Sequence, residues 1–258
     1  MALLNPSMNR WVATVLERPL NPPQVRDFES PRVLQNGGVG ANSYHCSATP
    51  VIFMTAQTIQ TQESLQEKRD HTPEEYLELE EKADYKSEYN DGTIVPMTGG
   101  TTDHNQIAGN CYTALSIGLK RQRFRIFFGD VRLWIPKTQN FKYSDVMVVA
   151  GEPEYYDDRK DTIMNPQIII EVLSDSTEAF DRSEKFKLYQ TIPTFQEYIL
   201  INQSKVEVDQ FFKTGNKRWS LYEYDNEDVE LSLKSFALQI PILDIYDKVD
   251  FRAYEANA

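Results

Sequence analysis

Cysteine is scarce in this chain of 258 residues, which contains only Cys46 and Cys111. Two cysteines cannot build a disulfide framework or a cysteine zinc site. Long apolar runs are also missing, and none approaches the ~18 residues of a membrane-spanning helix. The first residues carry Arg10, Glu17 and Arg18 and no apolar core, so we expect no secretory signal. These absences favour a soluble cytoplasmic protein with no membrane partner.

Basic residues are in deficit, since 27 Lys and Arg stand against 39 Asp and Glu, for a formal net charge of −12. A passive binder of nucleic acid would be basic, so the charge argues against that class. An enzyme acting on nucleic acid is still compatible, because catalytic carboxylates add negative charge. Glycine-rich phosphate loops, serine nucleophile elbows and nucleotide fingerprints are absent as well.

The first 70 residues differ from the rest of the chain. Residues 1–71 hold six Lys or Arg and six Asp or Glu, and prolines and glycines break any helical or strand periodicity. We expect residues 1–70 to be a largely disordered extension or linker and residues 71–258 to form one folded domain. Because Met54 opens an ordinary polar segment, translation starting there is a further hypothesis. A native peptide from upstream of Met54, found by mass spectrometry, would contradict it.

Hydrophobic periodicity predicts helices and strands from residue 72 onward. Thr72-Pro73-Glu74-Glu75 is typical of a capped helix start. Asn90-Asp91-Gly92 predicts a hairpin turn. The expected helices cover residues 72–82, 102–119 and 181–190. The expected strands cover residues 86–89, 93–97, 125–128, 131–135, 141–149, 168–173, 197–201, 205–212, 219–224 and 229–233. Mixed strands flanked by helices indicate an α/β fold with additional C-terminal strands.

Two acidic residues interrupt apolar strands. Asp145 opens the run Val146-Met147-Val148-Val149, and Glu171 lies within the apolar segment 168–173, which we place centrally in the sheet. A carboxylate there is costly unless a cation, a proton or a metal ion compensates it. Each acid alone is equally well explained as a salt-bridged structural residue. On successive strands the two could share one divalent cation, and oxygen ligands suit Mg²⁺ or Mn²⁺.

Glu88 and Lys185 are further candidates with simpler alternatives. Glu88 precedes the Asp91-Gly92 turn, where an exposed strand residue is the simpler interpretation. Lys185 shares a helical face with Asp181 and Tyr189 and can therefore point inward. A surface lysine paired with Asp181 explains it equally well.

His104 lies near a predicted helix start, where capping or packing is favoured over a role as proton carrier or phosphate contact. Two basic clusters could bind a polyanion: residues 120–125, and Lys213, Lys217 and Arg218. Cations that simply complement a helix end explain the first cluster as well. Dimerisation through a strand edge could build a larger cleft, so we expect a homodimer.

Several of these segments resemble one known group. Asp145 on one strand and Glu171 within the next are similar to the PD-(D/E)XK nuclease superfamily. The segment 85–95, Tyr143-Ser144-Asp145-Val146, Glu171-Val172-Leu173-Ser174, and Asp181-Arg182-Ser183-Glu184-Lys185 resemble the Uma-type restriction endonucleases in the same order. The resemblance covers roughly residues 70–250.

The resemblance implies a restriction-endonuclease-like core, in which helices flank a mixed central β-sheet. It implies a metal-dependent endonuclease that hydrolyses phosphodiester bonds of nucleic acid, with DNA as the expected substrate and Mg²⁺ or Mn²⁺ as cofactor. Asp145, Glu171 and Glu88 would hold the metal, and Lys185 would orient the attacking water or stabilise the transition state. The superfamily's usual lysine falls at Leu173 in this chain, and Lys185 on the following helix takes its place.

Two alternatives from other classes stay open. Leu173 and the acidic charge favour a binding protein that keeps the nuclease fold without the reaction and takes up no Mg²⁺ or Mn²⁺. A glycosidase could use Asp145 and Glu171 as an acid/base pair, although no aromatic-rich sugar platform accompanies either residue.

Overall fold

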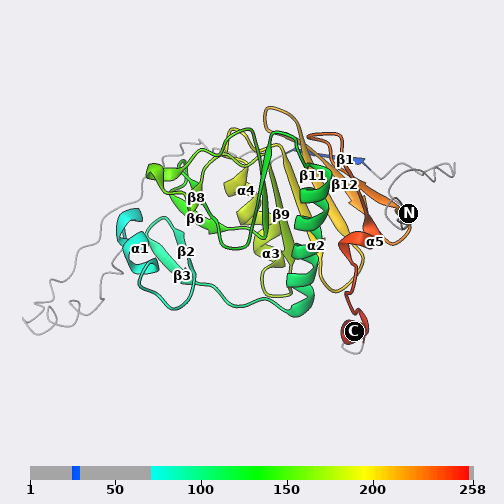
Figure 1. The fold of residues 1–258 in the computed structure, drawn as a ribbon, viewed down its shortest axis with the longest axis horizontal. Coiled ribbons are helices and arrows are strands. Elements are labelled where there is room, and N and C mark those ends of the chain that lie inside the picture. Colours follow the sequence, from blue (N-terminus) through cyan, green and yellow to red (C-terminus); the bar gives the residue numbers. More distant parts are fainter. Residues whose placement is uncertain (1–24, 30–70, 256–258) are drawn as a thin grey trace, which may run out of the picture.

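The computed structural model describes residues 25–29 and 71–255 as two main sheets with helices packed around them (Figure 1). The helical segments are α1 (Pro73–Glu80), α2 (Thr102–Gly118), the 3-10 turn η1 (Tyr156–Asp158), α3 (Glu178–Phe180), the π-helical turn η2 (Asp181–Lys185), α4 (Phe186–Tyr189), α5 (Ile242–Ile245) and α6 (Arg252–Glu255). Of the helices in these two ranges, none has both the length and the apolar character needed to cross a membrane.

Sheet A has seven strands in the order β1-β12-β11-β10-β9-β7-β4. These strands are β1 (Val25–Glu29), β4 (Phe124–Phe128), β7 (Val146–Ala150), β9 (Ile168–Leu173), β10 (Glu197–Asn202), β11 (Val208–Gly215) and β12 (Arg218–Tyr224). Strands β9 and β10 run parallel, and the other neighbours in the sheet are antiparallel. The predicted internal position of the apolar strand is confirmed, because β9 lies between β10 and β7 and is buried throughout.

Sheet B has five strands in the order β3-β2-β6-β5-β8. They are β2 (Ser87–Asn90), β3 (Thr93–Pro96), β5 (Arg132–Ile135), β6 (Asn140–Tyr143) and β8 (Thr162–Ile163). A third, two-stranded sheet pairs β13 (Glu230–Ser232) with β14 (Gln239–Pro241). The predicted α/β class with mixed strands and additional C-terminal strands is therefore confirmed.

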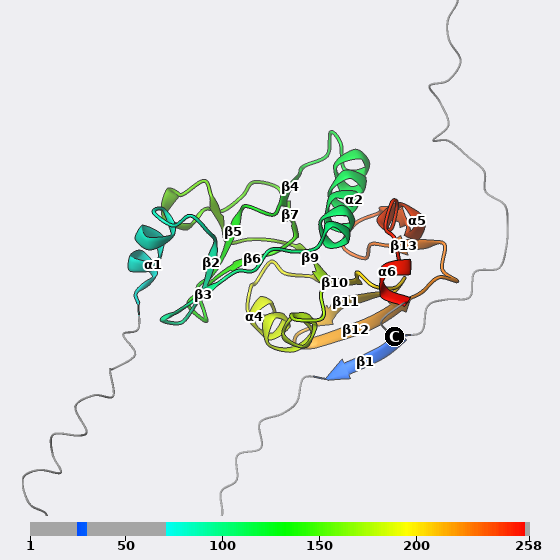
Figure 2. The ribbon, with the colours of Figure 1, turned by 90° about the horizontal axis from the view of Figure 1, so that it is seen from below.

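Helices cover both faces of sheet A (Figure 2). Helix α2 packs on one face, where its Ile107 and Leu115 join Ile170 and Val172 of β9 in one core. Helix α4 packs on the other face in a second core, which includes Ile169 and Leu173. Because side chains alternate along a strand, Glu171 is directed to the α4 face.

Local signals in the sequence fix two of these elements. Asp91 and Gly92 both have positive φ, 42° and 98°, as a two-residue hairpin turn between β2 and β3 requires. Helix α1 begins with the predicted capping box between Thr72 and Glu75. Helix α2 is capped by Thr101, whose side chain accepts from the backbone N–H of His104.

The strand predicted over residues 141–149 is divided in two. Strand β6 pairs with β5 in sheet B, whereas β7 pairs with β9 in sheet A, so the chain must turn at Ser144-Asp145. Apolar content alone could not reveal this break, because both halves are buried. The break places Asp145 just before β7, outside the paired residues of either strand.

One strand lies within the extension predicted for residues 1–70. Strand β1 pairs antiparallel with β12, from Val25 opposite Tyr222 to Glu29 opposite Arg218, and forms an edge of sheet A. Because β1 and β12 are far apart in the sequence, no local sequence pattern could predict that they pair. The rest of the predicted extension, with Met54, lies outside the described residues.

Candidate active site

Strand register places Asp145 beside Glu171. Strands β7 and β9 are antiparallel, and Val146 opposite Ile170 is their last pair at this end, so Asp145 and Glu171 each lie one residue beyond it. The backbone N–H of Val172 donates to Asp145 Oδ2 at 2.7 Å, which fixes the carboxylate against β9. The two acids selected from the sequence are therefore neighbours.

Glu171 is a buried carboxyl group with two partners on the α4 face. Its Oε1 lies 2.9 Å from Lys185 Nζ and accepts a 2.8 Å hydrogen bond from the Tyr189 hydroxyl. Burial raises the pKa of Glu171 to about 8; Lys185 opposes this shift, and the nearby carboxylates of Asp145 and Asp181 add to it. This carboxyl group therefore lies where an additional cation would stabilise its charged form.

Lys185 points inward from the π-helical turn η2. Besides Glu171, its ammonium lies 3.3 Å from Asp181 Oδ1. Burial on its own lowers the pKa of Lys185, but Glu171, Asp181 and Glu88 outweigh it and raise the pKa well above its usual value. Both interpretations from the sequence thus describe part of the arrangement, because Lys185 pairs with Asp181 and also reaches Glu171. The ammonium stays charged next to the acids.

Glu88 lies at the same site but is paired with a lysine. Its Oε2 is 2.6 Å from Lys142 Nζ, and its Oε1 accepts a 3.3 Å hydrogen bond from the backbone of Tyr143. It is thus not simply an exposed hairpin residue. Lys142 on β6 is completely buried; burial lowers its pKa and Glu88 opposes that shift. Glu88 as a metal ligand stays a prediction.

His104 reaches the site from the start of α2. Its Nε2 lies 2.9 Å from Asp145 Oδ1, and its backbone N–H donates to the capping hydroxyl of Thr101. The sequence favoured capping or packing for this side chain, whereas the fold directs the imidazole to Asp145. The reason is that α2 and β7 pack in the same core, a contact that spacing along the chain cannot reveal.

Lys142 is the member of this cluster that sequence reasoning missed. A usable signal was present, because Lys142 lies between Phe141 and Tyr143 in a strand that is otherwise apolar or amide-bearing. That is the same anomaly that singled out Glu171. We call the assembled group the acidic edge. Its members are Glu88, Asp145, Glu171 and Asp181, with Lys142, Lys185 and His104.

The acidic edge offers suitable oxygen donors for a hard divalent cation at Asp145 and Glu171. Each oxygen of Asp145 accepts one hydrogen bond from a described residue, so lone pairs remain. Lys185 Nζ and the Tyr189 hydroxyl both contact Oε1 of Glu171. Among the described residues, no three Asp, Glu, His or Cys side chains form a preassembled metal cage. Water or phosphate oxygens would complete the coordination, as is common for Mg²⁺.

The two basic clusters predicted from the sequence lie away from these acids. The backbone N–H of Gly151, just after β7, donates to the Arg123 carbonyl at 2.8 Å, and that of Lys213 donates to the Gln196 carbonyl at 2.9 Å, just before β10. Both clusters therefore flank the side of sheet A where β9 and β10 begin. We call this side, with residues 120–125, Lys213, Lys217 and Arg218, the basic edge. Glu171 lies toward the other ends of these strands.

The fold and two bacterial relatives connect this chain to known proteins. A solved structure described as "a putative nuclease belonging to DUF820 from Anabaena variabilis ATCC 29413" superposes with a TM-score of 0.56 at 21% identity. The superposition covers 68% of this chain and 97% of that one.

The uncharacterized proteins sll1609 and slr1290 of Synechocystis sp. are 40% and 38% identical to this chain over 160 and 182 residues. These matches cover 62% and 70% of this chain, and 90% and 93% of the relatives. The model of the Uma2 family, described as "Putative restriction endonuclease", matches residues 73–243, about two thirds of the chain. The matched segment contains all of Glu88, Asp145, Glu171 and Lys185. The chain therefore belongs to the Uma2 family.

Proposed function

We propose that this protein is a divalent-metal-dependent endonuclease that hydrolyses phosphodiester bonds of DNA, with Mg²⁺ or Mn²⁺ as cofactor. The observation that carries the proposal is the approach of Asp145 to Glu171 beside the buried ammonium of Lys185. Membership in a family described as a restriction endonuclease supports the same class of reaction.

The reaction adds water across one phosphorus–oxygen bond. The water oxygen joins phosphorus, the ester oxygen leaves and takes up a proton, and the products are a phosphate monoester and a hydroxyl. When bound, the cation would supply Lewis-acid stabilisation of the charge on the phosphate. Asp145 and Glu171 would hold it, with Glu88 as a proposed third ligand.

The side chains of the acidic edge would have different roles in the reaction, which follow from their different exposure to solvent. Asp145 and His104 are 24% and 20% exposed, whereas Glu171 and Lys185 are 4% and 9% exposed. A phosphate would thus meet Asp145 and His104 first. Lys185 would donate hydrogen bonds to the attacking water or to a phosphate oxygen. His104 would hold the Asp145 carboxylate in one orientation.

Leu173 supports a second candidate function, a nuclease fold that binds without cleaving. Its side chain is almost fully buried in the core under α4, so the superfamily's usual lysine position carries no cation here. A titration with Mn²⁺ separates the candidates, because a degenerate site would take up no metal and a competent one would bind it through Asp145 and Glu171.

The proposal extends to assembly and location. We propose DNA as the nucleic acid substrate, a homodimer as the working assembly and the cytoplasm as the location. Dimerisation would bring two copies of the site to one duplex.

The test is cleavage of plasmid and linear DNA, with RNA in parallel, in Mg²⁺, in Mn²⁺ and in EDTA. We expect cleavage with either metal and none in EDTA. Glu171→Gln should lower the rate by about 10²–10³-fold. Glu184→Gln is the matched control, because Glu184 is exposed and pairs only with Lys187 among the described residues. Cleavage in EDTA, or a wild-type rate for folded Glu171→Gln, would contradict the proposal.

A further inference from the structure

Strand β4 forms an open edge of sheet A. It lies at the far side of the sheet from β1, and among the described residues β7 is the one strand that pairs with it (Figure 2). Unpaired backbone groups make an edge strand a template for another strand. The other edges of sheets A and B are less suitable, because β3 contains Pro96, β8 has only two residues and β1 carries three charged side chains. Strand β4 carries one, Arg125, and is the most suitable edge for another chain.

Every second residue of β4 directs its backbone away from β7. The backbone N–H of Gly129 donates to the Asp145 carbonyl at 3.1 Å, as part of the ladder between these strands. Because hydrogen-bonded pairs alternate along an antiparallel ladder, the backbones of Phe124, Ile126 and Phe128 face outward. None of these three N–H groups has a hydrogen-bond partner in residues 25–29 and 71–255. The edge is therefore open along its whole length.

The sequence of β4 is complementary to itself in the antiparallel direction. Placing Ile126 opposite Ile126 of a second copy aligns all five residues of the strand. Outward-facing backbone then meets outward-facing backbone, as the ladder requires. In this register Phe124 lies opposite Phe128, and Arg125 lies opposite Phe127. Pairs of aromatic rings, and a cation beside a ring, stabilise neighbouring strands.

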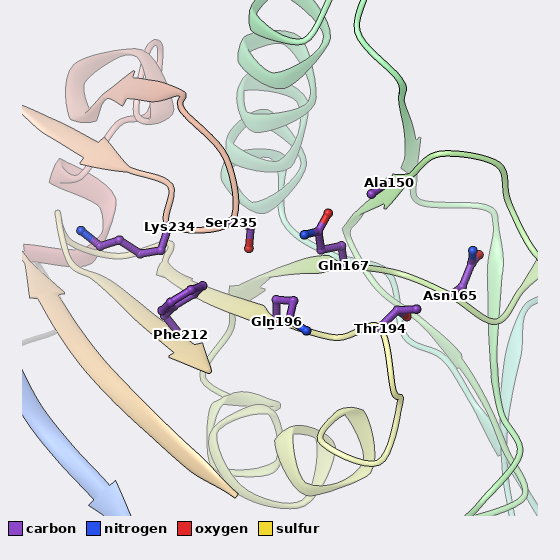
Figure 3. A pocket seen from close by; sticks show the side chains of 8 residues that line it. All are labelled: Ala150, Asn165, Gln167, Thr194, Gln196, Phe212, Lys234 and Ser235. Atoms are coloured by element: carbon purple, nitrogen blue, oxygen red, sulfur yellow. The ribbon is translucent and has the colours of Figure 1, made fainter. Parts of the chain in front are cut away.

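Aromatic side chains at both ends of β4 extend this match. The ring centroids of Tyr112 on α2 and Phe128 are 5.5 Å apart, and the two residues are 37% and 38% exposed. At the other end, the ring centroid of Phe236 lies 4.6 Å from that of Phe124. Phe236 follows Ser235, which lines a pocket of about 350 Å³ at this end of the sheet (Figure 3). With Phe124 opposite Phe128, these rings would form one row across two copies and cover the exposed surface of Tyr112.

The charges at the two ends of β4 are complementary as well. Residues 120–125 carry four cations at its start, whereas Asp130 follows its end and is 86% exposed. Asp130 pairs with Lys86 in the same chain, and Lys86 is itself 44% exposed. In the antiparallel register Arg123 lies opposite Gly129, next to Asp130. The basic start of each strand therefore meets the acidic end of the other.

We propose that β4 is the interface of a homodimer in which each copy supplies residues 120–125 to the acidic edge of the other. The inference rests on the homodimer of the proposed function and specifies its contact surface. Gly129 neighbours Asp145 in the ladder, so Arg123 of the second copy would lie two strand spacings, ~10 Å, from the Asp145 backbone. The dimer thus brings cations to a site whose own carboxylates repel DNA.

The first test is sedimentation equilibrium of the full chain beside Phe128→Lys. The lysine removes the ring opposite Phe124 in both halves of the interface and repels the basic start of the other strand. The dissociation constant of the dimer should therefore rise by at least about tenfold. Val229→Lys is the matched control, because Val229 is a 64% exposed apolar residue in the segment after β12. It should leave the dimer unchanged.

The register is tested by cross-linking. The double variant Arg125→Cys, Phe127→Cys should form a disulfide-linked dimer on oxidation, because residues opposite each other in a non-hydrogen-bonded pair have Cα atoms ~4.5 Å apart. Arg125→Cys alone should not cross-link, since position 125 is not opposite itself. Both proteins keep Cys46 and Cys111, so the single variant also controls for the native cysteines.

The supply of cations between copies is tested by mixing two variants. Asp145→Asn lacks the acid and Arg123→Glu lacks the cation. A heterodimer of the two has one site with an intact Asp145 and with Arg123 from the other copy. We expect the mixture to cleave DNA faster than the sum of the two variants measured separately. Absence of any gain, in a mixture that forms heterodimers, would mean that Arg123 acts within its own copy and would overturn the supply of cations between copies.

Two further outcomes would overturn the interface. A wild-type chain that stays monomeric, with and without DNA, would mean that the edge of β4 is covered within one chain. A dimer as tight in Phe128→Lys as in the wild type, without cross-linking of the double cysteine variant, would place the contact on another surface. Sedimentation and cross-linking do not depend on cleavage, so a failure of the proposed reaction and a failure of this interface are distinguishable.

Discussion

The acidic edge and the basic edge lie at opposite ends of strands β9 and β10, and their charged side chains differ in exposure to water. At the acidic edge, Glu171 and Lys185 are buried and paired with each other. At the basic edge, Lys217 and Arg218 are exposed. Electrostatic interactions strengthen when water is excluded. Buried charges therefore suit transition-state chemistry, whereas exposed cations suit the screened attraction of a polyanion.

Asp145→Asn should produce the largest effect. The amide weakens both the interaction with His104 and the hold on a cation, so cleavage should fall by at least about 10²-fold. Binding at the basic edge should be unchanged. Cleavage rates and the affinity for single-stranded DNA, measured on the same preparation, check both expectations, with exposed Asp244→Asn as control. Loss of both functions in a folded variant would show that the edges are not independent.

Lys185→Met should strongly destabilise the fold. It leaves Glu171 and Asp181 buried without their shared cation, and removing one partner of a buried pair costs about 3–5 kcal/mol. Urea unfolding followed by circular dichroism measures the loss. Lys187→Met, which removes an exposed lysine paired with Glu184, should change stability by less than about 0.5 kcal/mol. Equal losses in the two variants would mean that burial is not what distinguishes Lys185.

His104→Ala should reduce activity by about 10–100-fold, the usual effect of removing a group that orients a metal ligand. His104→Gln retains a side-chain donor and should recover part of the loss. The informative measurement is the Mn²⁺ affinity of both variants beside their cleavage rates. If both keep full Mn²⁺ affinity and rate, Asp145 does not need the imidazole.

The double variant Lys213→Ala, Lys217→Ala should have the smallest effect. It should weaken binding of single-stranded DNA several-fold and lower the salt slope by about 0.7 for each phosphate that the protein no longer neutralises, while kcat stays unchanged. Fluorescence anisotropy at several salt concentrations measures this slope. Lys137→Ala, an exposed lysine in the turn between β5 and β6, is the matched control. An unchanged slope would remove the basic edge from nucleic-acid binding.

Sequence reasoning reached most of the acidic edge because burial of charge leaves a local signature. Glu171 stands out inside an apolar strand, and Lys142 carries the same signature. His104 has no such signature, because its partner Asp145 comes from another element 41 positions along the chain. The basic clusters could be recognised in the sequence, but their distance from the acids could not be predicted from it.

The sequence by itself determined the α/β class, the capped start of α1, the β2–β3 turn and the identity of the two central acids. Each of these depends on residues within a few positions of one another, where propensity and periodicity act directly. Only the tertiary structure decided that the predicted strand breaks at Asp145, that His104 and Lys142 join the acids, and that the cations gather at the other edge. Those outcomes depend on strand register and on helix packing between distant segments, which local chemistry does not encode.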